Sequence, residues 1–129
     1  MLGFWVALGG AWGALSRFWV ISMLSGPVYT GFPWATFTVN VTGSFMLAVI
    51  LPFLQTNPTI RLAVVTGFLG AFTTFSTLAW EVFSLIRENQ FRTAALYLVV
   101  TMSAGLLAVW GGYEMGKFVL LRWFTGSVK

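Results

Sequence analysis

The chain has 129 residues, of which 58% are hydrophobic and 8% are charged, with seven Lys or Arg against three Asp or Glu. A soluble domain usually carries about 25% charged residues, so this composition excludes a water-soluble globule. The absence of Cys and His excludes a disulfide framework, thiolate and imidazole metal sites, and Ser-His or Cys-His nucleophile pairs. We therefore expect no enzyme, and basic residues without a cluster predict no nucleic-acid partner.

Long stretches without charge divide the chain into four predicted membrane spans. Residues 18–60, 62–80 and 93–113 contain no charged side chain, and a helix needs roughly 20 apolar residues to cross a bilayer. The spans are expected at residues 4–24, 34–54, 61–86 and 93–115, with a loop at 25–33 and a basic aromatic tail at 116–129. This predicts one all-α domain over residues 1–129, a multi-pass protein of the cell membrane surrounded by lipid.

The distribution of basic residues gives only a weak prediction of orientation. An even number of spans places both termini on one side, and the positive-inside rule favours cytoplasmic termini because that side carries more cations. The cations of that side are Arg61, Lys117, Arg122 and Lys129, against Arg87 and Arg92 on the other. We expect some copies to insert each way up.

Glycines four residues apart occur in the first and fourth spans, as Gly9 with Gly13 and Gly112 with Gly116. Such pairs let helix backbones approach closely in lipid. Packing within one subunit and packing between subunits both explain them. With so short a chain, we favour an oligomer.

Each span also carries one narrow stripe of polar or small residues at helical spacing. In lipid, polar groups face the protein interior or a water-filled cavity, so these stripes are candidate functional faces. Span by span the members are Gly10, Gly13 and Arg17; Thr36, Asn40 and Gly43; Thr77, Glu81 and Ser84; and Tyr97 and Thr101.

Structural interpretations of these residues stay open beside the functional ones. Ser and Thr often bond to carbonyls of their own helix. Asn40 is equally consistent with a helix–helix contact and with a pore lining. Arg17 and Glu81 either extend to the membrane surface, pair with each other, or take part in permeation or gating.

The sequence GFLGAFTTFST, residues 67–77, is a poor helix former in the middle of the third span. Gly costs about 1 kcal/mol relative to Ala in a helix, and β-branched Thr adds to this. We predict a broken helix here. Irregular backbone at bilayer depth is tolerated where it is buried or faces an ion or water, and unwound carbonyls coordinate alkali cations. An unbroken helix with a glycine contact face is the alternative.

Together with GGAWGALSR at residues 9–17 and TVNVTGSF at residues 38–45, this segment resembles the Fluc (CrcB) fluoride channels, small four-span proteins that export fluoride passively. The resemblance covers nearly the whole chain. It implies an antiparallel, dual-topology homodimer with two pores and with a structural Na⁺ at the dimer centre. On this chain the main-chain carbonyls that hold Na⁺ would belong to Gly70 and Thr73.

The same resemblance implies a fluoride path and a vestibule. Arg17 matches the family's vestibule arginine. The residues that the resemblance places along the path are Asn40, Phe75, Leu78, Tyr97 and Thr101, with Thr77 and Glu81 beside them.

Two positions depart from the family pattern, and they keep other functions open. Leu78 replaces the second of two pore phenylalanines, and Ala104 or Gly105 stands where the fourth span usually carries a hydroxyl. One alternative is a proton-coupled exporter of the small-multidrug-resistance type, which needs a membrane-embedded acid and has only Glu81 to supply it. Another is one subunit of a hetero-oligomeric channel, in which a complete partner compensates for a degenerate pore.

Overall fold

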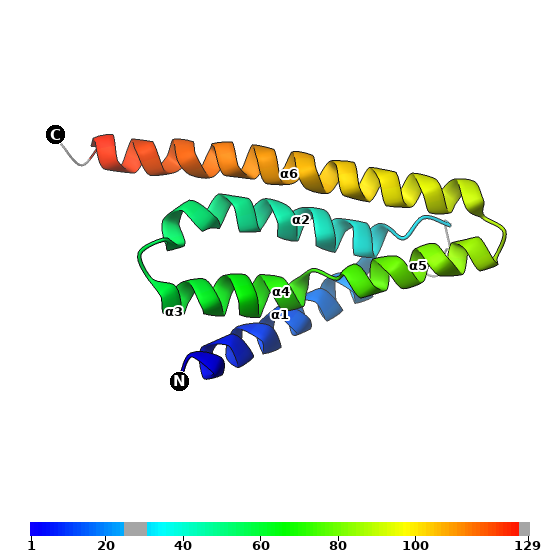
Figure 1. The fold of residues 1–129 in the computed structure, drawn as a ribbon, viewed down its shortest axis with the longest axis horizontal. Coiled ribbons are helices and arrows are strands. Elements are labelled where there is room, and N and C mark those ends of the chain that lie inside the picture. The colour runs from blue at the N-terminus through cyan, green and yellow to red at the C-terminus, as the bar shows by residue number, and fades with distance from the viewer. Residues whose placement is uncertain (25–30, 127–129) are drawn as a thin grey trace.

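The computed structural model describes residues 1–24 and 31–126, and within them every regular element is helical (Figure 1). Four helical segments are long and apolar enough to cross a membrane. The first is α1, Leu2–Leu24, and the second is α2, Trp34–Ile50, which continues as the 3₁₀ turn η1, Leu51–Leu54. Of the predicted loop at 25–33, residues 25–30 lie outside the described part.

The third span consists of four consecutive pieces, and the fourth is a single helix. The pieces are α3, Pro58–Arg61; the π-helix η2, Leu62–Leu69; α4, Gly70–Phe72; and α5, Phe75–Arg87. The last helix is α6, Phe91–Gly126. The beginning of α1 and the end of α6 lie at the same end of the bundle (Figure 1), as an even number of spans requires.

Local capping fixes where the third span begins and ends. Asn57 precedes Pro58, and its side-chain oxygen accepts hydrogen bonds from the amides of Thr59 and Ile60, both at 3.1 Å. Asn and Pro at these two positions are a standard helix start. At the other end Asn89 has a φ of 61°, a left-handed conformation that Asn tolerates and that stops the helix.

The paired glycines bring helices together inside one chain. A Cβ added to Gly9 or Gly13 would collide with backbone of the third span, at Ala63 and Phe68. Correspondingly, α1 packs on η2 and α4. Of the two explanations left open for this pair, packing within one subunit is confirmed, and the oligomer stays a prediction that these two glycines do not support.

The second glycine pair joins α6 to α2 in the same way. A Cβ at Gly112 would lie 2.6 Å from the carbonyl oxygen of Phe45, and one at Gly116 would lie 2.6 Å from that of Val49. These contacts hold α2 alongside α6 over much of its length (Figure 1). Both glycine pairs therefore face another helix of the same chain.

The fourth helix extends beyond the predicted span. The span was predicted to end near residue 115, with the basic tail after it, and α6 runs through this boundary to Gly126 without a break. Its 36 residues span about 54 Å at 1.5 Å per residue, well beyond the roughly 30 Å of a hydrocarbon core. The last turns of α6 extend past the connection between α2 and α3 (Figure 1). Residues 127–129, including Lys129 of the predicted tail, lie outside the described part.

The helix break predicted in the third span is confirmed, and the continuous-helix alternative is wrong. Regular helix stops at Phe72 and resumes at Phe75. The two residues between are extended, Thr73 with φ −74° and ψ 156° and Thr74 with φ −148° and ψ 110°. The π-helix before the break was not predicted; it is a rare conformation, usually seen as a single-turn bulge and often at functional sites.

Candidate functional site

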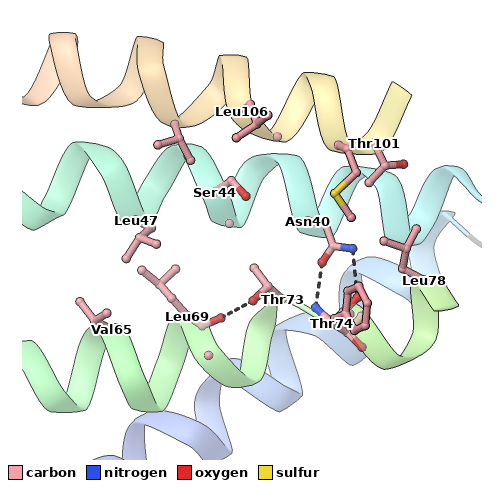
Figure 2. Close-up of a pocket in the computed structure, with 16 residues that line it drawn as sticks. Asn40, Ser44, Leu47, Val65, Leu69, Thr73, Thr74, Leu78, Thr101 and Leu106 are labelled. Carbon is pink, nitrogen blue, oxygen red and sulfur yellow. Dashed lines mark hydrogen bonds between the residues drawn. The ribbon is translucent and has the colours of Figure 1, made fainter. Parts of the chain in front are cut away.

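Asn40, in the middle of α2, spans the gap to the helix break. Its Nδ2 donates to the carbonyl oxygen of Thr74 at 3.1 Å, and its Oδ1 accepts from the amide of Thr74 at 2.8 Å (Figure 2). One side-chain amide thus satisfies both backbone polar groups of the extended residue. Because Asn has two N–H donors, one remains beyond the bond to Thr74.

Thr74 in turn caps the helix that follows. Its hydroxyl accepts from the amide of Thr77 at 3.2 Å and donates to the Thr77 hydroxyl at 2.9 Å. A hydroxyl before the first helical residue that accepts from the third is the usual N-cap arrangement. On the other side of the break the Thr73 hydroxyl donates to the carbonyl of Leu69 at 2.9 Å (Figure 2).

A cavity of about 410 Å³ lies between α2, the pieces of the third span and α6. Asn40 and Leu47 extend toward it from α2, and Val65 and Leu69 extend toward it from the π-helix (Figure 2). Six of the predicted site residues line it, namely Asn40, Gly70, Thr73, Phe75, Leu78 and Thr101. The lining therefore brings together residues from three spans that the sequence places far apart.

Thr101 stands out among the polar residues of this cavity. Only 4% of it is exposed, and its hydroxyl oxygen has no hydrogen-bond partner in the part of the chain that the structure describes. Buried hydroxyls are nearly always bonded. The hydroxyl of this lining residue is therefore buried without a protein partner, and donation to an ion is one role that would satisfy it.

Tyr97 and Glu81 meet each other and do not line the cavity. The Tyr97 hydroxyl donates to one carboxylate oxygen of Glu81 at 2.7 Å, and the Thr36 hydroxyl donates to the other at 2.8 Å. Tyr97 and Thr36 are almost wholly buried. The three side chains tie α2, α5 and α6 together, and a direct contact of Tyr97 with a permeating ion stays a prediction.

The two positions of the family's phenylalanine pair have contrasting surroundings. Phe75, the first residue of α5, is 73% exposed in the single chain, whereas Leu78 is 2% exposed and packs with Leu85, Ala94 and Tyr97. Both line the cavity. Leu78 therefore belongs to the hydrophobic core with only one side toward the cavity, and Phe75 stands at its rim.

Arg17 lies half-buried on α1 and is not among the residues that line the cavity. A pair between Arg17 and Glu81 was one of the alternatives left open, and it is wrong. Glu81 accepts hydrogen bonds from the hydroxyls of Thr36 and Tyr97. The one ion pair within the described residues joins Lys117 to Glu114. The vestibule role of Arg17 stays a prediction.

Sequence reasoning missed two polar residues of this site, Thr74 and Ser44, as well as apolar ones. Thr74 lay inside the segment singled out as unhelical, and its spacing of three from Thr77 is a capping signal. Ser44 lines the cavity from α2; it lies four residues after Asn40, on the same helix face, and that spacing identifies it. The lining residues Met102 and Leu106 carry no comparable signal, because an apolar residue in a span is unremarkable.

These features define a multi-pass integral membrane protein with an interrupted third span and a partly polar cavity at bilayer depth. The sequence model of the family described as CrcB-like protein, Camphor Resistance (CrcB), matches residues 4–113. The chain belongs to this family, which confirms the resemblance seen in the sequence.

Several relatives carry the name fluoride-specific ion channel FluC. One from Acidobacterium capsulatum is 42% identical over 120 residues, which cover 90% of this chain and 96% of the relative. Another, from Hahella chejuensis, is 37% identical and covers 90% and 94% of the two chains. A third, from Ignicoccus hospitalis, is 38% identical and covers 90% and 95%.

Proposed function

We propose that this protein is a fluoride-selective ion channel, which lets fluoride leave the cell down its electrochemical gradient and so lowers fluoride in the cytoplasm. The relatives named as fluoride channels support the choice of ion. The observation that carries the proposal is the partly polar cavity beside the helix break, which is lined by Thr101, a residue whose buried hydroxyl has no partner in the described part of the chain. Such a path needs neither ATP nor a catalytic group.

The donors around the cavity suit a small, strongly hydrated anion. A conducting site must replace water and still release the ion, which favours several weak contacts over one strong one. The neutral donors are the Thr101 hydroxyl and the remaining N–H of Asn40, and the ring edge of Phe75 adds a positive partial charge. The first amides of α5, which begins at Phe75, add the positive end of a helix dipole. Arg17 contributes its charge from outside the cavity lining.

We propose that two copies form an antiparallel dimer. A cavity of about 410 Å³ holds many waters, so one chain does not by itself force fluoride to shed its shell. A second copy that covers the exposed rings of Phe75 and the side chain of Leu106, 73% exposed each, would narrow the path. The weak charge bias between the two ends is compatible with opposite insertion of the two copies.

We also propose that a Na⁺ is held at the centre of this dimer by the carbonyls of Gly70 and Thr73. A helix that ends at bilayer depth leaves its last carbonyls without amide partners, and α4 begins at Gly70 and ends at Phe72, just before Thr73. Alkali cations take such oxygens as ligands. The donor set therefore fits, and the ion would add a positive field along the anion path.

The exporter alternative is not favoured. A proton-coupled carrier needs its acid to face the substrate cavity, but both oxygens of Glu81 accept hydrogen bonds from hydroxyls, and Glu81 does not line the cavity. The hetero-oligomer alternative is tested by measuring fluoride flux in liposomes that contain only this chain.

The test is fluoride efflux from liposomes that contain only the purified chain, with chloride efflux as the control for selectivity. We expect fast fluoride release and no chloride release. Release of neither anion, or of both at similar rates, would refute the proposal. Fluoride release that appears only when a related second chain is added would identify a hetero-oligomer.

A further inference from the structure

Two backbone amides at the helix break bond to side-chain oxygens in place of the carbonyls that they would bond in a continuous helix. In a continuous α-helix the amide of Thr74 bonds to the carbonyl of Gly70, and the amide of Thr77 bonds to that of Thr73, each four residues earlier. In this structure the Thr74 amide donates to Oδ1 of Asn40 and the Thr77 amide donates to the Thr74 hydroxyl. The side chains of Asn40 and Thr74 thus accept from the amides that would otherwise bond to two backbone carbonyls.

The carbonyls released in this way are those of Gly70 and Thr73, the pair assigned to Na⁺ above. The amide that is taken decides which oxygen is released, so side chains that bonded to neighbouring amides instead would release other carbonyls. The break leaves four carbonyls, residues 70–73, without their helical amides, and those of Gly70 and Thr73 are the two whose amides bond to side chains instead. Thr74 is 5% exposed, so solvent does not compete for its hydroxyl.

Removing either side-chain acceptor would return the corresponding amide to its backbone carbonyl. An amide at bilayer depth has no water to bond to, and leaving it unsatisfied costs several kcal/mol. The nearest replacement acceptor is the carbonyl four residues earlier. The amide would return to it, the helix would lengthen across the break, and one ligand oxygen would be withdrawn.

From this geometry we propose that Asn40 and Thr74 are positioning residues for the cation site: each takes up the amide that would otherwise occupy one of the two ligand carbonyls. The inference rests on the proposed Na⁺ site and explains how one chain prepares its half of it. Asn40 also lines the anion cavity, so the residue that prepares the cation site contacts the proposed fluoride path as well.

Fluoride flux does not test this inference, because both residues line the cavity. The measurement is instead the thermal unfolding of the purified full-length chain in detergent, with Na⁺ titrated against N-methyl-D-glucamine at constant ionic strength. The quantity compared is the Na⁺ concentration that gives half of the full stabilisation. The variants are Asn40→Ala, Thr74→Val and Thr74→Ser.

Thr77→Val is the matched control, because it removes a hydroxyl from the same cap and leaves the Thr74 acceptor in place. We expect Asn40→Ala and Thr74→Val to raise the half-stabilising Na⁺ concentration about tenfold, the equivalent of one net hydrogen bond. Thr74→Ser, which keeps the hydroxyl, and Thr77→Val should stay within about twofold of the unmodified chain.

The outcomes separate this inference from the proposed function. An unmodified chain whose stability ignores Na⁺ would overturn the Na⁺ site and this inference with it. A Na⁺-stabilised chain with unchanged midpoints for Asn40→Ala and Thr74→Val would overturn the inference alone. If Thr74→Val does not fold at any Na⁺ concentration, Thr74→Ala, which removes the same acceptor with a smaller side chain, is judged by the same tenfold criterion.

Discussion

Replacing Thr101 by valine separates a structural from a conducting role for this residue. Valine has nearly the shape of threonine but has a methyl group in place of the hydroxyl. Thr101 lines the cavity, and its hydroxyl is buried and has no partner between residues 31 and 126 or on α1. A hydroxyl kept for stability and a hydroxyl kept for an ion therefore predict opposite results.

The expected magnitudes follow from the missing partner. A buried unsatisfied polar group costs about 1–3 kcal/mol, so Thr101→Val should leave the free energy of unfolding unchanged or raise it by up to this amount. A hydrogen bond to a charged group contributes about 1.5–3 kcal/mol. Its loss along the anion path should therefore slow fluoride flux by about 10- to 100-fold, at 1.4 kcal/mol for each factor of ten.

The assay pairs two measurements on the same preparation. Fluoride efflux from liposomes gives the flux, and thermal or denaturant unfolding in detergent gives the stability. Thr101→Ser, which keeps a donor, should retain most of the flux. Thr42→Val is a second control, because the Thr42 hydroxyl donates to the carbonyl of Thr38 in its own helix at 2.6 Å.

Two results would contradict this reasoning. Flux equal to that of the unmodified chain in Thr101→Val would mean that the hydroxyl does not contact the permeating ion. A clear loss of stability would mean that the hydroxyl has a bonding partner in the assembled protein, so that its absence from the hydrogen-bond network of one chain is not evidence for a free donor.

Three further substitutions test other parts of the site. Asn40→Asp should abolish fluoride flux in liposomes, because a carboxylate replaces a donor beside the path; undiminished flux would remove Asn40 from it. Phe75→Ile should reduce flux strongly, since Leu78 has no ring edge to substitute; normal conduction would make Phe75 a packing residue. Gly43→Ala should lower the unfolding temperature and the flux together, because a Cβ there would collide with Cγ2 of Thr73; an unchanged unfolding temperature would show that the break moves freely.

The sequence was sufficient to predict the spans, because charge-free length is a direct signal of membrane insertion. It did not locate the end of α6. Hydropathy falls after Tyr113, but Glu114 and Lys117 form an ion pair three residues apart, and the leucines that follow favour helix. Membrane insertion depends on hydropathy, whereas helix formation depends on local propensity and side-chain pairs. The helix therefore continues beyond the predicted end of the span.

The polar stripes predicted which faces turn inward but not what each residue meets there. Tyr97 and Glu81 are on facing sides of α6 and α5, and the two side chains bond to each other. Helical periodicity gives the direction of a side chain on its own helix. Whether it meets an ion or another side chain depends on how the helices are placed, which a single span does not encode.

The position of the break was predictable and its stabilisation was not. Gly70 and the threonines after it show that regular helix is weak there, since local composition decides propensity. The side chain that satisfies the backbone groups of the break at bilayer depth is Asn40, which lies 34 residues away from Thr74 in the sequence. Only the packing of α2 against the third span brings that amide to the extended residue. A weak helix without such an acceptor would stay wound in lipid, because an imperfect backbone hydrogen bond is better than none. In this chain the interrupted span thus depends on a polar side chain of a neighbouring span, and that side chain is a candidate functional residue.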